Sequence, residues 1–190
     1  TLTEKEQEEY LTVLSEETTR LSSLTKQLLT LASLDQESEL RKKEPVRLAK
    51  QWRQLIQMTE WSWREKELTI NLDLADVNYT GDAELLYQVW SNLLTNAIKF
   101  TPPGGNIQIR LHEDTTNILV EVQDSGIGIS KPDLAKIFDR FYKANQSRTR
   151  EEGSSGLGLS ICQKIIALHH GEITVESNHG TTFTVKLPKN

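Results

Sequence analysis

Apolar residues recur every three or four positions through the first forty residues, a segment without proline or glycine. This spacing predicts one long amphipathic helix over residues 1 to about 40. Its stripe consists of Leu11, Leu14, Thr18, Leu21, Thr25, Leu28 and Ala32, widened by Leu24, Leu31 and Leu34. A lone helix has no core of its own, so we expect this stripe to need a partner in a bundle or coiled coil. Polar residues ending at Pro45 then predict a linker.

Beyond the linker, the hydrophobic pattern alternates between a helical and an extended period. It predicts helices over residues 46–65, 85–98, 131–142 and 156–168, and strands over residues 68–74, 77–80, 107–111, 118–122, 173–175 and 182–187. Residues 144 to 155 are polar and predict a mobile lid. This mixture favours an α/β domain with helices packed on one face of a mixed β-sheet.

The composition limits the class of protein. At 190 residues and 21.6 kDa, the chain can form one domain of ordinary size with an appendage. The single cysteine, Cys162, excludes a disulfide framework and predicts a packed core thiol in a reducing compartment. No apolar run approaches the roughly 20 residues that span a bilayer, and no signal peptide is recognisable. A net charge of −5 argues against a non-specific nucleic-acid binder.

The positions of the tryptophans and of two adjacent histidines favour structural roles. The tryptophans lie on or near predicted helices and are better explained by packing than by stacking on bases: Trp52, Trp61, Trp63 and Trp90. His169 and His170 precede Gly171 at a predicted helix end. A capping and dipole role is expected there rather than metal binding.

A glycine-rich stretch opens the last predicted helix at Gly156-Leu157-Gly158-Leu159. A helix start exposes unpaired backbone N–H groups, and glycines let a phosphate approach them. No Lys-Ser/Thr pair follows and no strand directly precedes it, so neither a Walker loop nor a dinucleotide fingerprint fits. Taken alone, the stretch is better explained as a flexible loop with a glycine cap.

Two asparagines and a lysine share one strip of a predicted helix. Asn92 and Asn96 are four residues apart and Lys99 follows three later, so their side chains project together, and Asp82 can cap the helix. Amide oxygens suit Mg²⁺, and a cation suits phosphate. The alternative is an ordinary solvated face, although asparagine is a mediocre helix former.

A carboxylate stands at the end of a predicted strand. Asp124 follows the alternating run 118–123, and Gly126 and Gly128 come directly after it. Such a carboxylate can accept a hydrogen bond from a purine amino group while the glycines let the backbone close on the ring. An ordinary Asp-Ser-Gly turn is the alternative, and it would be preferred for this segment alone.

The order of these clusters resembles the N, G1, F and G2 boxes of bacterial sensor histidine kinases. The matching motifs are Asn92-x-x-x-Asn96-Ala-x-Lys99-Phe100, Asp124-x-Gly126-x-Gly128, Phe138-x-x-Phe141-Tyr142 and Gly156-Leu157-Gly158-Leu159. The resemblance runs from about residue 45 to the end. It implies the Bergerat-type α/β (α+β) sandwich of the gyrase, heat-shock, kinase and mismatch-repair ATPases.

The resemblance also implies a role for each matching residue, with ATP and Mg²⁺ as cofactors. Asn96 resembles the Mg²⁺ ligand, Asn92 the residue that orients metal, water and phosphates, and Lys99 a phosphate contact. The residues implied in nucleotide binding are Phe100, Asp124, Gly126, Gly128, Lys143, Gly156, Leu157, Gly158 and Thr181.

Within this set, Asp124 resembles the adenine-reading carboxylate and Thr181 a hydroxyl near the same base. Lys143 stands where many members carry arginine, and lysine lacks the two-pronged geometry of a guanidinium. Arg148 and Arg150, in the predicted lid, are further candidates for phosphate contacts.

By resemblance, residues 1–40 are the second helix of a dimerisation bundle, 41–45 a linker, and 46–190 the catalytic ATP-binding domain. The family phosphorylates a histidine on the first bundle helix, but none of the histidines at 112, 169, 170 and 179 has that setting. We therefore expect a cytoplasmic piece of a membrane-anchored receptor that lacks its own acceptor and has an exposed apolar stripe. The implied partners are a second copy, joined through the first helix, and the receiver domain of a response regulator.

Two other classes remain open. A clamp ATPase of the gyrase or mismatch-repair kind would place a glutamate base where Asn92 stands. A non-catalytic dimerisation or scaffold module would not need the intact asparagine, aspartate and glycine boxes.

Overall fold

The computed structural model describes residues 3–144 and 155–189. The helices are α1 (Glu4–Asp35), α2 (Leu48–Met58), α3 (Glu60–Glu65), α4 (Ala83–Phe100), α5 (Lys131–Leu134) and α6 (Gly158–Leu168). The strands are β1 (Glu44–Arg47), β2 (Thr69–Leu74), β3 (Asn78–Gly81), β4 (Asn106–Glu113), β5 (Asn117–Asp124), β6 (Glu172–Glu176) and β7 (Thr181–Pro188). None of the described helices is both long and apolar enough to cross a membrane.

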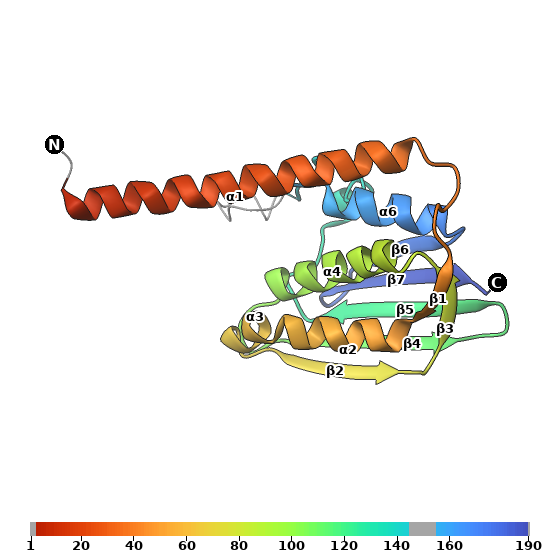
Figure 1. The fold of residues 1–190 in the computed structure, drawn as a ribbon. Coiled ribbons are helices and arrows are strands. Elements are labelled where there is room, and N and C mark those ends of the chain that lie inside the picture. Colours follow the sequence, from red (N-terminus) through yellow and green to blue (C-terminus); the bar gives the residue numbers. More distant parts are fainter. Residues whose placement is uncertain (1–2, 145–154, 190) are drawn as a thin grey trace.

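Five strands form the main sheet in the order β2-β4-β5-β7-β6. Only the β2–β4 pair is parallel, so the sheet is mixed, and β1 and β3 pair separately as an antiparallel ribbon. The helices α2, α4 and α6 lie together on one side of the sheet, and α1 lies along the outside of α6 (Figure 1). This layered arrangement confirms the predicted fold class.

Between the helices and the sheet lies a continuous hydrophobic core. Trp52 of α2 and Trp90 of α4 are fully buried, with ring centroids 5.4 Å apart. The indole N–H of Trp90 donates to Oε1 of Gln51 at 3.0 Å, which satisfies its only polar atom. The packing role predicted for these two tryptophans is confirmed, whereas Trp61 is 75% exposed and packs little.

The first helix divides into two parts. Thr3 and Glu6 form a capping box at its start, and the helix ends at Asp35 rather than near residue 40. Its predicted stripe is exposed at Leu11, Leu14, Leu21 and Leu28, but Leu31 and Leu34 are buried against the rest of the chain. The expectation of a stripe exposed throughout was therefore wrong, because the last turns pack beside α6.

Two predicted helices are shorter than expected. Val46 pairs with Tyr79 in the β1–β3 ribbon, and the remainder of the 46–65 segment breaks at Thr59 into α2 and α3. The Thr59 hydroxyl donates to the Leu55 carbonyl at 2.9 Å, which helps to satisfy the end of α2. In the 131–142 segment only α5 is helical. The following residues form turns that close at Tyr142.

Lys66 holds the end of α4. Its ammonium donates to the carbonyls of Ile98, Lys99 and Thr101 at 2.8, 2.9 and 3.0 Å. Carbonyls in the last turn of a helix lack intrahelical partners and carry the negative end of the helix dipole, so a cation there satisfies both requirements.

We predict that Lys66→Met lowers the free energy of unfolding by about 1.5–3 kcal/mol, because charged hydrogen bonds to otherwise unpaired carbonyls are lost. Urea denaturation measures the change. Lys50→Met, on the exposed side of α2, is the matched control and should stay within about 0.5 kcal/mol of the unsubstituted chain. Equal stabilities for the two variants would mean that Lys66 contributes nothing beyond its solvated charge.

Candidate functional site

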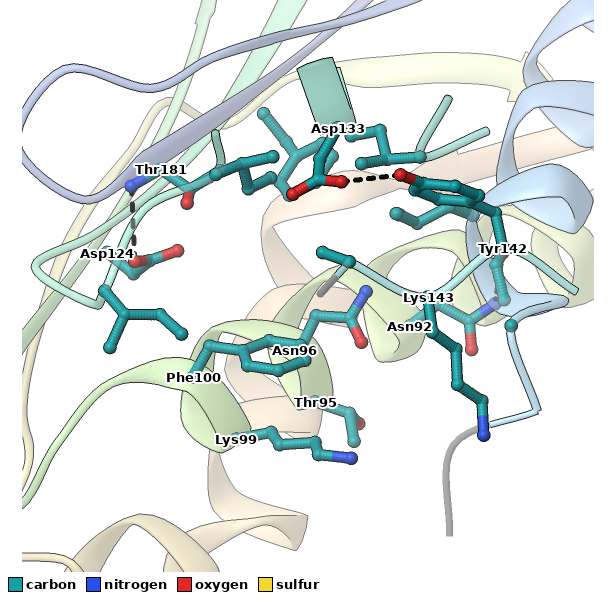
Figure 2. Close-up of a pocket in the computed structure, with 18 of the residues that line it drawn as sticks. Asn92, Thr95, Asn96, Lys99, Phe100, Asp124, Asp133, Tyr142, Lys143 and Thr181 are labelled. Carbon is teal, nitrogen blue, oxygen red and sulfur yellow. Dashed lines mark hydrogen bonds between the residues drawn. The ribbon is translucent and has the colours of Figure 1, made fainter. Parts of the chain in front are cut away.

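A pocket of about 690 Å³ lies beside α4, where the end of β5 and the start of β7 meet the start of α6 (Figure 2). This volume is in the range of sites that hold small molecules and cofactors. The sequence-predicted residues that line it are Asn92, Asn96, Lys99, Phe100, Asp124, Gly128, Lys143, Gly156, Gly158 and Thr181. The structure therefore brings segments that are far apart in the sequence to one cavity.

One wall of the pocket is the polar strip of α4. The opposite side of this helix is buried at Leu86, Val89, Trp90, Leu93, Leu94, Ala97 and Ile98. Burial of that face fixes the rotation of the helix, so Asn92, Asn96 and Lys99 are turned toward the cavity, as Figure 2 shows. Asp82 caps the helix by accepting the N–H groups of Glu84 and Leu85, both at 3.1 Å.

The amide of Asn92 is oriented by α6. Its Nδ2 group donates to the Gly158 carbonyl at 3.2 Å and to Sγ of Cys162 at 3.6 Å. Because the donor side is used in this way, the Oδ1 atom is the group left for a ligand. Burial raises the pKa of the Cys162 thiol to about 12, despite the opposing bond from Asn92, so the predicted packed core thiol is confirmed.

At the other end of the pocket lies Asp124, only 5% exposed. The β5–β7 register places it opposite Thr181. Its Oδ1 atom accepts the N–H groups of Gly126 at 2.8 Å and Thr181 at 3.3 Å, while Oδ2 receives no hydrogen bond from the described residues. Burial raises the pKa of this carboxyl, and the two N–H bonds oppose the shift.

Gly126 and Leu157 do not line the pocket. A Cβ atom on Gly126 would lie 2.5 Å from the Phe100 carbonyl oxygen and 2.6 Å from Oδ1 of Asp124, so only glycine lets this turn close on the carboxylate. Leu157 is fully buried in the hydrophobic core just before α6. Both residues therefore support the pocket from behind.

Lys143 reaches the pocket from a tightly held segment. Phe141 has a φ of +62°, and its N–H donates to the Gly156 carbonyl at 2.9 Å. Gly156 has a φ of +73°, and a Cβ there would meet the Phe141 backbone at 2.7 Å, so a glycine is required. Most of the predicted lid, with Arg148 and Arg150, lies outside the described residues.

Several lining residues were not among the predicted site residues, and they include Gln27, Thr95, Ser130, Asp133 and Tyr142. The buried Asp133 carboxylate accepts the Tyr142 hydroxyl at 2.5 Å and the Ser130 hydroxyl at 2.6 Å (the Tyr142 bond is drawn in Figure 2). The Ser130-x-x-Asp133 spacing is a helix-start signal that could have located this corner. No sequence signal points to Gln27.

His169 is a structural residue. Its Nδ1 atom lies 2.8 Å from the Ile165 carbonyl, and its Nε2 atom accepts the Asp82 N–H at 3.1 Å. Burial lowers the pKa of the ring, so it acts as a neutral link between α6 and α4 and not as a charge on the helix dipole. Within residues 3–144 and 155–189, no cluster of three or more His, Cys, Asp or Glu could hold a metal ion.

Comparison with known proteins agrees with this geometry. Residues 81–190 match the family of histidine kinase-, DNA gyrase B- and HSP90-like ATPases. The catalytic domain of histidine kinase ThkA superposes with a TM-score of 0.70 at 30% sequence identity, over 78% of this chain and 98% of that one. The chain belongs to the histidine kinase family. It thus contains the catalytic domain of a histidine kinase.

Longer relatives match the first helix as well. The heme sensor protein HssS of Staphylococcus saprophyticus is 39% identical over 98% of this chain, which spans 41% of that protein. HssS of Staphylococcus aureus is 40% identical over 91% of this chain, which spans 37% of it. A structure of ThkA in complex with the response regulator TrrA superposes with a TM-score of 0.79 at 27% identity, over all of this chain and 53% of that one. These matches favour a two-component sensor kinase over a gyrase-type clamp.

We predict that Asp124→Asn leaves the chain equally or more stable at pH 7. The pKa of Asp124 in the folded chain lies above the usual value of 3.8, so at pH 7 the ionised carboxylate lowers the free energy of unfolding. The amide oxygen of an asparagine can still accept both N–H bonds. The difference from the unsubstituted chain should vanish near about pH 3, where the carboxyl binds a proton. Thermal unfolding at the two pH values measures this.

Asp73→Asn, on the exposed edge strand β2, is the control for the loss of one surface charge. Lower stability of Asp124→Asn at pH 7 would show instead that the negative charge itself holds the turn together.

Proposed function

We propose that this chain binds Mg²⁺–ATP and transfers its γ-phosphate to a histidine on a dimerisation helix, for relay to a response regulator. The observation that carries the proposal is the polarity of the pocket. A buried carboxylate, Asp124, stands at one end, and two amides and two lysines stand at the other (Figure 2). The carboxylate can accept a hydrogen bond from an adenine amino group, and the amides and lysines can bind a triphosphate with its metal ion.

The base end is suited to adenine in detail. Oδ2 of Asp124 can accept a hydrogen bond from the exocyclic amino group, because both backbone donors bind Oδ1. The Thr181 side chain lies at the same end, and Ile127, Ile129 and Phe183 add apolar walls for a ring. A buried acceptor discriminates strongly, since a base that offers no donor would leave it unpaired.

At the phosphate end, Asn96 and the free Oδ1 of Asn92 are the oxygen ligands that Mg²⁺ prefers. Lys99 and Lys143 can neutralise phosphate oxygens, and Phe100 lies under the Lys99 ammonium, 5.4 Å from the ring centre. Bound there, Mg²⁺ would neutralise charge on the leaving and transferred phosphates. The protein's own contribution is to hold these groups in fixed positions.

The acceptor has to be supplied from outside this pocket. All four histidines lie within the described residues, at 112 in β4, at 169 and 170 after α6, and at 179 before β7, and none lines the cavity. We therefore assign the acceptor to a histidine helix that pairs with α1. The exposed leucines of α1 provide a surface for such a helix and for a homodimer, and the full-length protein would be membrane-anchored with this part in the cytoplasm.

We predict that Asp124→Asn lowers affinity for ADP about ten- to a hundredfold, because one charge-assisted hydrogen bond to the base is lost and an amide nitrogen can oppose the adenine amino group. Titration calorimetry with Mg²⁺–ADP measures the change. Asp73→Asn should bind as the unsubstituted chain does. Unchanged affinity in a folded Asp124→Asn protein would refute the assignment of the base end.

We predict that the chain with labelled ATP will not phosphorylate itself, but will label an added peptide helix that carries a histidine-bearing bundle sequence. Phosphoryl transfer needs the acceptor in line and within about 3–3.5 Å of the γ-phosphorus, which none of the four histidines can reach. Asn96→Ala should abolish the transfer while leaving the fold intact. Acid-labile label on the chain alone would place the acceptor among its own histidines.

A further inference from the structure

One residue of the pocket comes from the long helix that precedes the catalytic domain. Gln27 of α1 lines the same cavity as Asn92, Asn96 and Lys143. Its neighbours on α1 explain how it reaches this place, because Leu31, one turn further on, is buried in the core. The nucleotide pocket is therefore assembled from both parts of the chain.

The geometry of α1 and α6 places Gln27 at the phosphate end. A second hollow is lined by Leu31 and Asp35 of α1 together with Ser160, Gln163, Lys164 and Ala167 of α6. The two helices lie side by side (Figure 1). Gln27 is one turn before Leu31 and shares the pocket with Gly158 and Leu159, at the start of α6. Gly158 is the residue whose carbonyl orients Asn92.

The side chain of Gln27 has an unused hydrogen-bonding group. Its Oε1 atom is buried and has no hydrogen-bond partner among the described residues. A buried acceptor without a donor is unfavourable, and few native groups are left in this state unless a ligand or water completes them. Water bound to a metal ion at the triphosphate is a donor of the required kind, and the amide N–H₂ can in turn donate to a phosphate oxygen.

Two contacts hold this part of α1 in place. Leu31 and Leu34 are each only 3% exposed. Nη2 of Arg140 donates to both carboxylate oxygens of Asp35, at 2.9 and 2.7 Å. Arg140 belongs to the segment that leads to Lys143, so the ion pair links the helix to the segment that supplies a cation to the pocket.

We propose that Gln27 is a nucleotide-binding residue that contacts the hydrated metal ion and the terminal phosphates, and that it couples the position of α1 to nucleotide affinity. This inference rests on the proposed function of the pocket. Coupling of this kind is reciprocal, so a bound triphosphate stabilises the docked position of α1 by the same factor with which docking improves affinity.

The test compares Gln27→Ala with Gln7→Ala, an exposed glutamine of the same helix. Affinities for a non-hydrolysable Mg²⁺–ATP analogue and for AMP are measured by calorimetry. Gln27→Ala should lower the affinity for the triphosphate three- to tenfold, as expected for the loss of one hydrogen bond, and leave the affinity for AMP unchanged. Gln7→Ala should change neither. Unchanged or tighter binding of the triphosphate by Gln27→Ala would overturn the proposal.

A second variant tests the coupling without touching the pocket. Asp35→Ala removes the ion pair with Arg140 and should lower the affinity for the triphosphate. Combining it with Gln27→Ala should cause little further loss of affinity. Fully additive losses, or no loss for Asp35→Ala, would refute the coupling. If the unsubstituted chain binds neither nucleotide, the proposed function itself fails. If the unsubstituted chain binds both nucleotides and Gln27→Ala leaves both affinities unchanged, this inference alone fails.

Discussion

The rotation of α4 about its own axis governs the site. Its apolar face is buried against Trp52 and the neighbouring helix α6, and any turn of the helix would expose that face. With the rotation fixed, a spacing of four and then three residues is enough to bring Asn92, Asn96 and Lys99 into one cavity. Asp82 at the beginning and Lys66 at the end fix its position along the axis. The packing of the apolar face thus determines how the polar side chains of α4 are aligned.

In the proposed function, burial of Asp124 improves recognition of the base but lowers the stability of the fold. A carboxylate in water would distinguish poorly between bases, because water competes for its oxygens. In a low-dielectric corner the same hydrogen bond is stronger and a mismatch is costlier. Two backbone donors on one oxygen limit this cost, while the second oxygen receives no hydrogen bond from the described residues and is available to the proposed ligand. The raised pKa of the carboxyl is the sign of this compromise.

The parts of the site that follow local periodicity could be predicted from the sequence. The polar strip on α4 can be predicted from the helical repeat alone, and the glycine turn after Asp124 can be predicted from its residue types alone. The pairing of Asp124 with Thr181 joins residues 57 apart, and only the strand register reveals it. The start of α2 at Leu48 rather than at Val46 reflects the pairing of β1 with β3, which the sequence does not reveal. Gln27 lies on the same face of α1 as Leu31 and Leu34, but its contribution to the pocket depends on how α1 packs beside α6, which the sequence does not reveal.

The state of Cys162 has a practical consequence. It is the only cysteine of the chain, it is fully buried, and its thiol has a pKa of about 12, so the reactive thiolate is nearly absent at neutral pH. The native protein therefore offers a silent background for labelling chemistry. A cysteine introduced at an exposed polar position of α1, such as Glu16, would take a fluorophore or spin label without removal of the native thiol. Movements of the helix relative to the nucleotide domain could then be followed by spectroscopy in an otherwise unaltered chain.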